Sequence, residues 1–140
     1  MKALVVFDSA YGNTEKVARA IAAGLAPHAE VRLVRAGEAR LPDLDAVGLL
    51  AVGSPTQGGK PTPAIQQFLS SIAPDGLRGV GVASFDTRIS AKGRGLGMRL
   101  LVGAFGYAAG RIADNLKGKG GSLVAPPEGF IVEGREGPLR

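Results

Sequence analysis

The first 25 residues change from the pattern of a buried strand to that of an amphipathic helix within one short turn. The run Lys2–Phe7 carries no charge after Lys2 and indicates a short strand buried on both faces. From Asn13 the apolar residues follow helical spacing, with charged residues on the opposite face. Because a strand that leads directly into a helix is the repeating unit of parallel sheets, this feature favours an α/β fold.

Small polar residues fill the turn between this strand and this helix. A helix N-terminus presents unpaired N–H groups and the positive end of its dipole, and both attract an anion. Glycine lets the backbone approach a ligand closely, and the hydroxyl and amide side chains beside it are neutral donors. We therefore expect an anion-binding turn formed by Ser9, Ala10, Tyr11, Gly12, Asn13 and Thr14.

An ordinary strand-to-helix connection, in which Ser9 or Asn13 only caps the helix, is the alternative for this turn. The turn lacks the Gly-x4-Gly-Lys-Ser/Thr spacing of a mononucleotide P-loop. It also lacks the Gly-x-Gly-x-x-Gly signature of dinucleotide-binding folds. Residue types alone leave the anion site and the helix cap both open.

Strand and helix patterns alternate along the rest of the chain, with a break at Pro126–Gly129 in the last strand. Right-handed crossovers leave few arrangements of such elements. We predict one domain over residues 1–140, a three-layer α/β sandwich with a five-stranded parallel sheet in the order 2-1-3-4-5. The predicted strands are 2–7, 29–34, 46–52, 79–85 and 122–125 with 130–132, and the predicted helices are 13–25, 64–72 and 104–117.

The composition excludes several kinds of site. Without cysteine the chain has no disulfide, thiolate metal site or cysteine nucleophile, which fits a cytoplasmic location. No cluster has metal-ligand spacing, no stretch approaches the roughly 20 apolar residues of a membrane span, and Asp8 interrupts any signal peptide.

The net charge of +5 is compatible with nucleic acid, an anionic surface or an acidic protein partner. Scattered basic residues and few aromatics disfavour nucleic acid.

The segment from Val5 to Ile21 resembles the opening signature of flavodoxins and flavodoxin-like proteins. Val5 and Val6 are aliphatic, Phe7 is aromatic, and Ser9 follows Phe7 by two positions. Gly12, Thr14 and Ala18 also stand at the positions that the signature requires. The resemblance implies that the turn after the first strand wraps the phosphate of FMN with neutral donors, without a lysine or arginine. It also implies a flavodoxin-like fold.

Some features depart from this family pattern. Tyr11 stands where many electron-carrier flavodoxins have threonine, although Tyr-Gly-Asn-Thr occurs in other branches. Many of those carriers are acidic and dock on basic partners, whereas this chain is basic. The sequence stops at Arg140, where the final helix of a flavodoxin should start. We expect that this helix is missing, or that a partner chain, as in a homo-oligomer, covers the apolar surface it leaves.

The loop after the third strand resembles the second flavin loop of the family. When FMN takes up one electron and a proton at N5, a backbone carbonyl must turn to accept a hydrogen bond from the new N5–H, and the resemblance suggests Gly58 for this carbonyl. A mobile glycine-rich loop without a ligand is the alternative. The residues expected to contact FMN here are Ser54, Pro55, Thr56, Gln57, Gly58 and Gly59.

The residues at the end of the fourth strand and just after it, Ser84, Phe85, Asp86 and Thr87, resemble the third flavin loop. In the family, backbone N–H groups and an acidic or hydroxyl side chain read the pyrimidine edge of the flavin, and Asp86 and Thr87 match that role. No aromatic stands where electron-carrier flavodoxins sandwich the ring, and Gln57 takes the first of those positions. Phe85 would partly compensate, and one face of the ring would stay free.

A glycine-rich insertion at Ala91–Gly103 is expected to pack on the protein or form a subunit contact, because apolar residues are more often core than substrate site.

The resemblance implies an FMN-binding flavoprotein that transfers electrons to a redox partner protein or a small-molecule acceptor. One alternative is an oxidoreductase, an FMN-dependent NAD(P)H reductase of quinones or nitro compounds. Another is a flavodoxin-fold module that has lost FMN. A phosphoacceptor receiver is excluded because no acidic pair follows the first strand.

Overall fold

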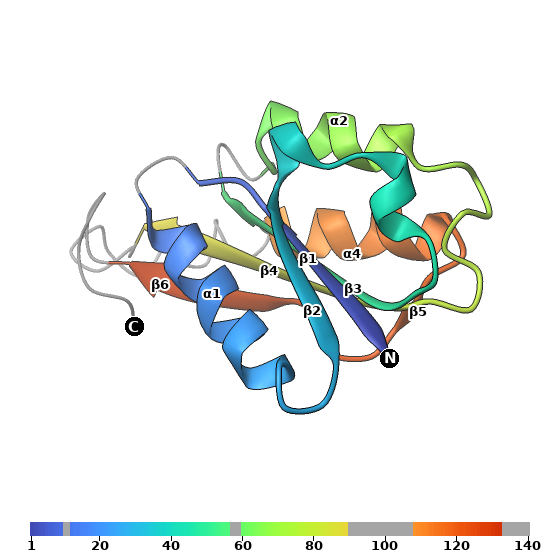
Figure 1. Cartoon of the computed structure of the whole chain (residues 1–140). Coiled ribbons are helices and arrows are strands. Elements are labelled where there is room, and N and C mark those ends of the chain that lie inside the picture. Colours follow the sequence, from blue (N-terminus) through green and yellow to red (C-terminus); the bar gives the residue numbers. More distant parts are fainter. Residues whose placement is uncertain (10–11, 57–59, 90–107, 133–140) are drawn as a thin grey trace.

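The computed structural model is an α/β sandwich in which a parallel sheet lies between two layers of helices (Figure 1). The structure describes residues 1–9, 12–56, 60–89 and 108–132. The elements in chain order are β1 (Lys2–Phe7), α1 (Asn13–Leu25), β2 (Glu30–Arg35), the short 3-10 turns η1 (Ala36–Glu38) and η2 (Leu41–Leu44), β3 (Val47–Pro55), α2 (Pro63–Ser71), β4 (Gly81–Ile89), α4 (Ala108–Gly118), β5 (Ser122–Leu123) and β6 (Glu128–Val132).

The strands follow the order β2-β1-β3-β4-β5, which confirms the predicted order 2-1-3-4-5. All described pairings are parallel. β5 pairs with Gly81–Val82 of β4, and β6 pairs with Phe85–Ile89 of the same strand. The two pieces therefore form one interrupted edge strand. Pro126 and Pro127 lie between them, and proline cannot donate to a strand ladder.

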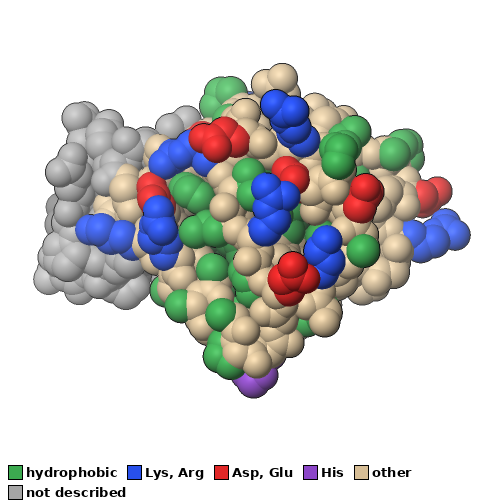
Figure 2. Space-filling view, viewed as in Figure 1, with side chains coloured by type: hydrophobic (Ala, Val, Ile, Leu, Met, Phe, Trp, Pro, Cys, Tyr) green, Lys and Arg blue, Asp and Glu red, His purple; other side chains and the backbone are tan. Residues whose placement is uncertain are grey.

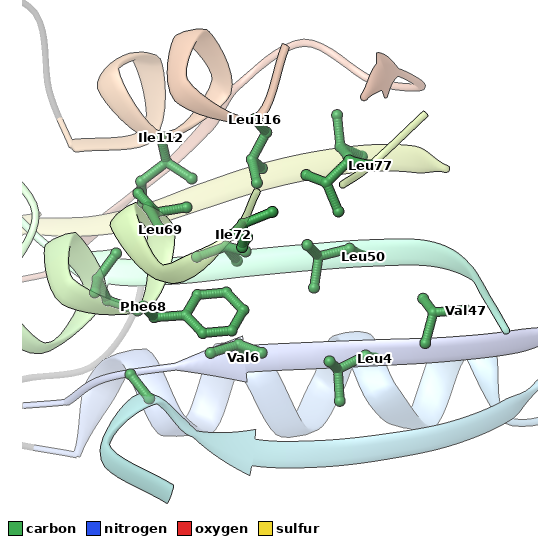
Figure 3. Packing of buried hydrophobic residues seen from close by; sticks show 14 of the residues in the cluster. Leu4, Val6, Val47, Leu50, Phe68, Leu69, Ile72, Leu77, Ile112 and Leu116 are labelled. Atoms are coloured by element: carbon green, nitrogen blue, oxygen red, sulfur yellow. The ribbon is translucent and has the colours of Figure 1, made fainter. Parts of the chain in front are cut away.

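Alternate side chains of β1 support the two faces of the sheet. Leu4 and Val6 face α2 and α4, whereas Val5 and Phe7 face α1. Figure 3 shows the first of these clusters, in which side chains of α2 and α4 meet those of the central strands. The strand β2 alternates between exposed and partly buried residues along most of its length, as expected of an edge strand.

Two strands are longer than the sequence predicts. β3 continues past Val52 to Pro55, and β4 continues past Phe85 to Ile89. Their last residues stay paired, with Ser54 opposite Asp86. The prediction ended both strands where polar residues begin. The structure shows that these polar side chains are buried with hydrogen-bond partners, so the ladder continues through them.

The other predicted boundaries agree within about two residues where the structure describes them. The helix predicted over 104–117 is described from Ala108 to Gly118. The expected insertion at 91–103 and the position of the expected final helix lie outside the described residues. Among the described helices none is long and apolar enough to cross a membrane.

Candidate functional site

The turn between β1 and α1 presents an open helix N-terminus. Gly12 is the N-cap of α1 and has a left-handed backbone, with φ of 91°. Its N–H donates to Ser9 Oγ at 2.9 Å, and no side chain caps the first turn of the helix. A Cβ at Gly12 would have no atom within 4 Å. The first-turn amides of α1 are therefore left without a side-chain cap, an arrangement that suits an anion.

A chain of three threonines connects this turn to the neighbouring strand ends. The hydroxyls of Thr14 and Thr87 lie 2.7 Å apart, and both side chains are buried. The carbonyl of Thr87 accepts from the N–H of Thr56 at 2.9 Å. Thr56 Oγ1 accepts from the N–H of Ala108 at 3.2 Å, at the start of α4. The ends of β3 and β4 and the starts of α1 and α4 are thus joined by hydrogen bonds.

A second connection runs from Asp8 to α2. Asp8 Oδ2 accepts from Thr62 Oγ1 at 2.6 Å, and the Thr62 N–H donates to Ser54 Oγ at 2.9 Å. Thr62 is also the N-cap of α2, since its hydroxyl accepts from the N–H of Ile65. The hydroxyl of Ser54 in turn donates to the carbonyl of Pro55 at 2.8 Å. The β1–α1 turn and the loop after β3 therefore hold one another in place.

Two buried polar side chains of β4 bind the first turn of α4. Asp86 Oδ2 accepts from the N–H of Ala109 at 2.8 Å, and the Ser84 hydroxyl donates to the carbonyl of the same residue at 2.8 Å. Asp86 is fully buried, and its side chain satisfies a backbone N–H in the first described turn of α4. The Asp86 side chain thus fixes the start of a helix beside the site.

The ring of Phe85 packs against α1 and covers Gly53. Phe85 is 2% exposed, and a Cβ placed on Gly53 would lie 2.0 Å from the ring. The two residues are paired across β3 and β4. Because the ring belongs to the core on the α1 side, any contact of Phe85 with a ligand at the strand ends would come from its backbone.

Charged side chains flank the β1–α1 turn on the side of β2. Arg35 Nη2 lies 2.9 Å from Glu15 Oε1, and its guanidinium carbon lies 5.0 Å from the centre of the Phe7 ring. Hydrogen bonding from Arg19, with the charges of Arg19 and Arg35, lowers the pKa of Glu15 below its ordinary value. Arg35 Nη1 also lies 4.0 Å from Asp8 Oδ1, so that Arg35 is engaged by two carboxylates. On the face shown in Figure 2, basic and acidic side chains are interspersed.

An open cleft of about 650 Å³ lies between α2 and α4, next to the loop that follows β3. Both helices begin at the carboxyl edge of the sheet. Among the described residues, no group of His, Cys, Asp and Glu side chains could hold a metal ion. The residues that line the cleft are Lys60, Pro61, Gln66, Leu69, Arg111, Asp114 and Asn115.

The described part of the sequence-predicted site lies just after β1, at the start of α1, at the end of β3 and in the second half of β4. It comprises Ser9, Gly12, Asn13, Thr14, Ser54, Pro55, Thr56, Ser84, Phe85, Asp86 and Thr87. Ala10, Tyr11, Gln57, Gly58 and Gly59 lie outside the described residues. Sequence reasoning missed Thr62 and Arg35. The Thr-Pro pair at 62–63 is a signal for a helix start that could have identified Thr62.

One family model matches nearly the whole chain, and several solved structures share its fold. The family model described as flavodoxin matches residues 5–139. A flavodoxin from the domain Archaea is 24% identical with a TM-score of 0.78, over 95% of this chain and 85% of that one. Oxidised flavodoxin 1 from Bacillus cereus is 20% identical with a TM-score of 0.73, over 95% and 86%. Rubredoxin oxygen:oxidoreductase from Desulfovibrio gigas is 23% identical with a TM-score of 0.72, over 95% and 30%. No curated protein sequence matches the chain.

Proposed function

The chain belongs to the flavodoxin family and is an FMN-binding electron-transfer protein, and we propose that it holds the FMN phosphate in the turn of residues 9–14. The ring would then lie between the loops that follow β3 and β4. In this proposal the protein is an electron carrier of one domain. Its cofactor-binding residues are those that the sequence predicts, including the five outside the described residues.

The open N-terminus of α1 carries the proposal. The first-turn amides have no side-chain cap, Gly12 leaves open space, and the nearby Thr14 and Ser9 add hydroxyls. Arg35, the cation beside the turn, is engaged by Glu15 and Asp8. These residues fit a phosphate bound by neutral donors, because backbone N–H groups and a helix dipole supply the attraction.

The side chains around the turn bind and orient rather than react. FMN supplies the one- and two-electron chemistry when it is bound. Thr14 and Thr87 join the phosphate turn to the end of β4, and Asp8 and Thr62 join it to the loop after β3. A network of this kind joins these residues before a ligand arrives, and such preorganisation reduces the cost of binding. The absence of cysteine from the sequence fits the cytoplasmic location that the proposal includes.

The experiment is a titration of the protein with FMN and, separately, with riboflavin, followed by flavin fluorescence. Riboflavin has the same ring but no phosphate. We expect FMN to bind at least tenfold more tightly, because a bound phosphate adds several charge-assisted hydrogen bonds. Equal affinities, or no binding of either flavin, would contradict a phosphate site in the turn. Oxidation of NADH by the FMN-loaded protein alone would contradict the carrier role and favour the reductase.

A further inference from the structure

The cleft between α2 and α4 adjoins the proposed flavin site but is formed by other residues. Lys60 belongs to the loop that follows β3, four residues after Thr56. Arg111 lies in the first turn of α4, whose start is bound by Thr56 Oγ1. The cleft therefore lies beside the carboxyl edge of the sheet.

The cleft has basic and amide side chains around an apolar base. Pro61 and Leu69 are buried, whereas Lys60, Arg111 and Asn115 are exposed. Gln66 Nε2 donates to the carbonyl of Pro61 at 2.8 Å, which fixes this amide side chain on the wall of the cleft.

The charges around the cleft are mainly positive. Its acidic lining residue, Asp114, has Lys117 Nζ 3.8 Å from Oδ1, so that a neighbouring cation already offsets its charge. Lys60 takes part in none of the ion pairs between described residues. The cleft thus attracts carboxylates.

We propose that the cleft between α2 and α4 is the docking site for an acidic redox partner protein, whose Asp or Glu side chains bind between Lys60 and Arg111. The inference rests on the proposed function, because electron transfer requires the partner to approach the flavin edge. Complementary charge raises the rate of encounter and sets the orientation of docking. An exposed cleft with charges on its rim suits a transient complex, in which the partner must also dissociate quickly.

The test uses the FMN-loaded, 15N-labelled protein and a deca-glutamate peptide as a probe of known charge. Amide signals of residues 60–69 and 111–115 are expected to shift, and binding is expected to weaken when NaCl rises from about 50 to 500 mM. Lys60→Gln and Arg111→Gln should each weaken binding about two- to fivefold, the range of an exposed ion pair. Arg78→Gln is the control, since Arg78 is 79% exposed and precedes β4 at the opposite edge.

Equal weakening by all three variants, or shifts spread over the whole surface, would overturn the docking site. Tighter binding of a single-stranded DNA of 20 nucleotides than of the peptide would also overturn it. A protein that fails to bind FMN refutes the proposed function, whereas a protein that binds FMN without localised peptide shifts refutes the docking site alone. The two failures are thus distinguishable.

A kinetic measurement connects the cleft to electron transfer. Ferricyanide is a trianion that accepts one electron, so two ions oxidise one fully reduced FMN-loaded protein. The oxidation rate at low salt is expected to fall severalfold in the Lys60→Gln/Arg111→Gln variant and to stay unchanged in Arg78→Gln. At about 1 M salt the difference should disappear, because the Debye length is then about 3 Å. Equal rates for all variants at low salt would contradict a role of the cleft in docking.

Discussion

The hydroxyls of Thr14 and Thr87 lie 2.7 Å apart, although the two residues are 73 positions apart in the chain. Thr14 is 1% exposed and Thr87 is 5% exposed, so neither hydroxyl can replace its partner with bulk water. Thr14 is the second residue of α1, and Thr87 lies near the end of β4. The contact therefore joins the phosphate turn to the strand that would face the flavin.

Thr14→Val keeps the shape of the side chain and removes its hydroxyl. We expect a loss of about 1 to 3 kcal/mol in the free energy of unfolding, because Thr87 keeps a buried hydroxyl without this partner. Urea denaturation of the single variants and of Thr14→Val/Thr87→Val measures the coupling. The double variant should lose less than the sum of the two single variants. Additive losses would show that the two hydroxyls do not interact.

Gly12→Ala tests the left-handed N-cap. The φ of 91° disfavours any residue with a Cβ, and the space around the position is open, so the cost is in the backbone alone. We expect a destabilisation of about 1 to 2 kcal/mol. Gly110→Ala within α4 is the matched control and should stabilise by about 0.5 to 1 kcal/mol, because its Cβ also meets nothing within 4 Å. If both variants were destabilised, or both stabilised, the left-handed N-cap at Gly12 would be refuted.

Gly53→Ala tests the close contact between β3 and the ring of Phe85. The new Cβ would lie 2.0 Å from the ring, so either the ring or the strand must move. We expect a destabilisation of about 1 to 3 kcal/mol, measured by thermal unfolding. In Gly53→Ala/Phe85→Leu the smaller side chain frees space, and this double variant should unfold at a higher temperature than Gly53→Ala. A wild-type melting temperature for Gly53→Ala would contradict the contact.

Glu15 makes the stability depend on pH. Its pKa is lowered in the folded state by the hydrogen bond from Arg19 and by the charges of Arg19 and Arg35. A lowered carboxyl pKa stabilises the fold above the unfolded pKa of about 4.3, and this contribution is lost as the pH falls through the folded value. Glu15→Gln should therefore reduce the loss of stability between about pH 5 and pH 3. The free energy of unfolding would be measured by urea denaturation at several pH values. The same loss of stability at acid pH in Glu15→Gln and in the unchanged protein would contradict this role.

The sequence predicts the elements of this fold well because their patterns are local. β1 and α1 have the predicted bounds, and the break at Pro126 and Pro127 identifies the interrupted edge strand. The ends of β3 and β4 were predicted too early, since polar residues such as Ser54 look like loop residues until their buried partners are known. Burial with a hydrogen bond is a property of the folded chain that local periodicity does not contain.

The site is predictable as a set of segments but not as a network. Topology brings the ends of β1, β3 and β4 to one edge, and the sequence identified residues in all of these segments. The contacts of Asp8 with Thr62, and of Arg35 with Glu15, join residues from different elements. Their partners depend on rotamers and on strand register, which a single sequence does not specify. Asp86 illustrates the same limit, because its bond to Ala109 appears only when α4 is placed.

The chain of threonines has a consequence for the rate at which electrons pass. Hydrogen bonds run from Thr14 through Thr87 and Thr56 to Ala108 at the start of α4, so the corner of the molecule around them is expected to behave as one stiff body. Polar groups that are already aligned need little rearrangement when a charge beside them appears or disappears. The protein scaffold itself should then add little to the reorganisation energy of electron transfer.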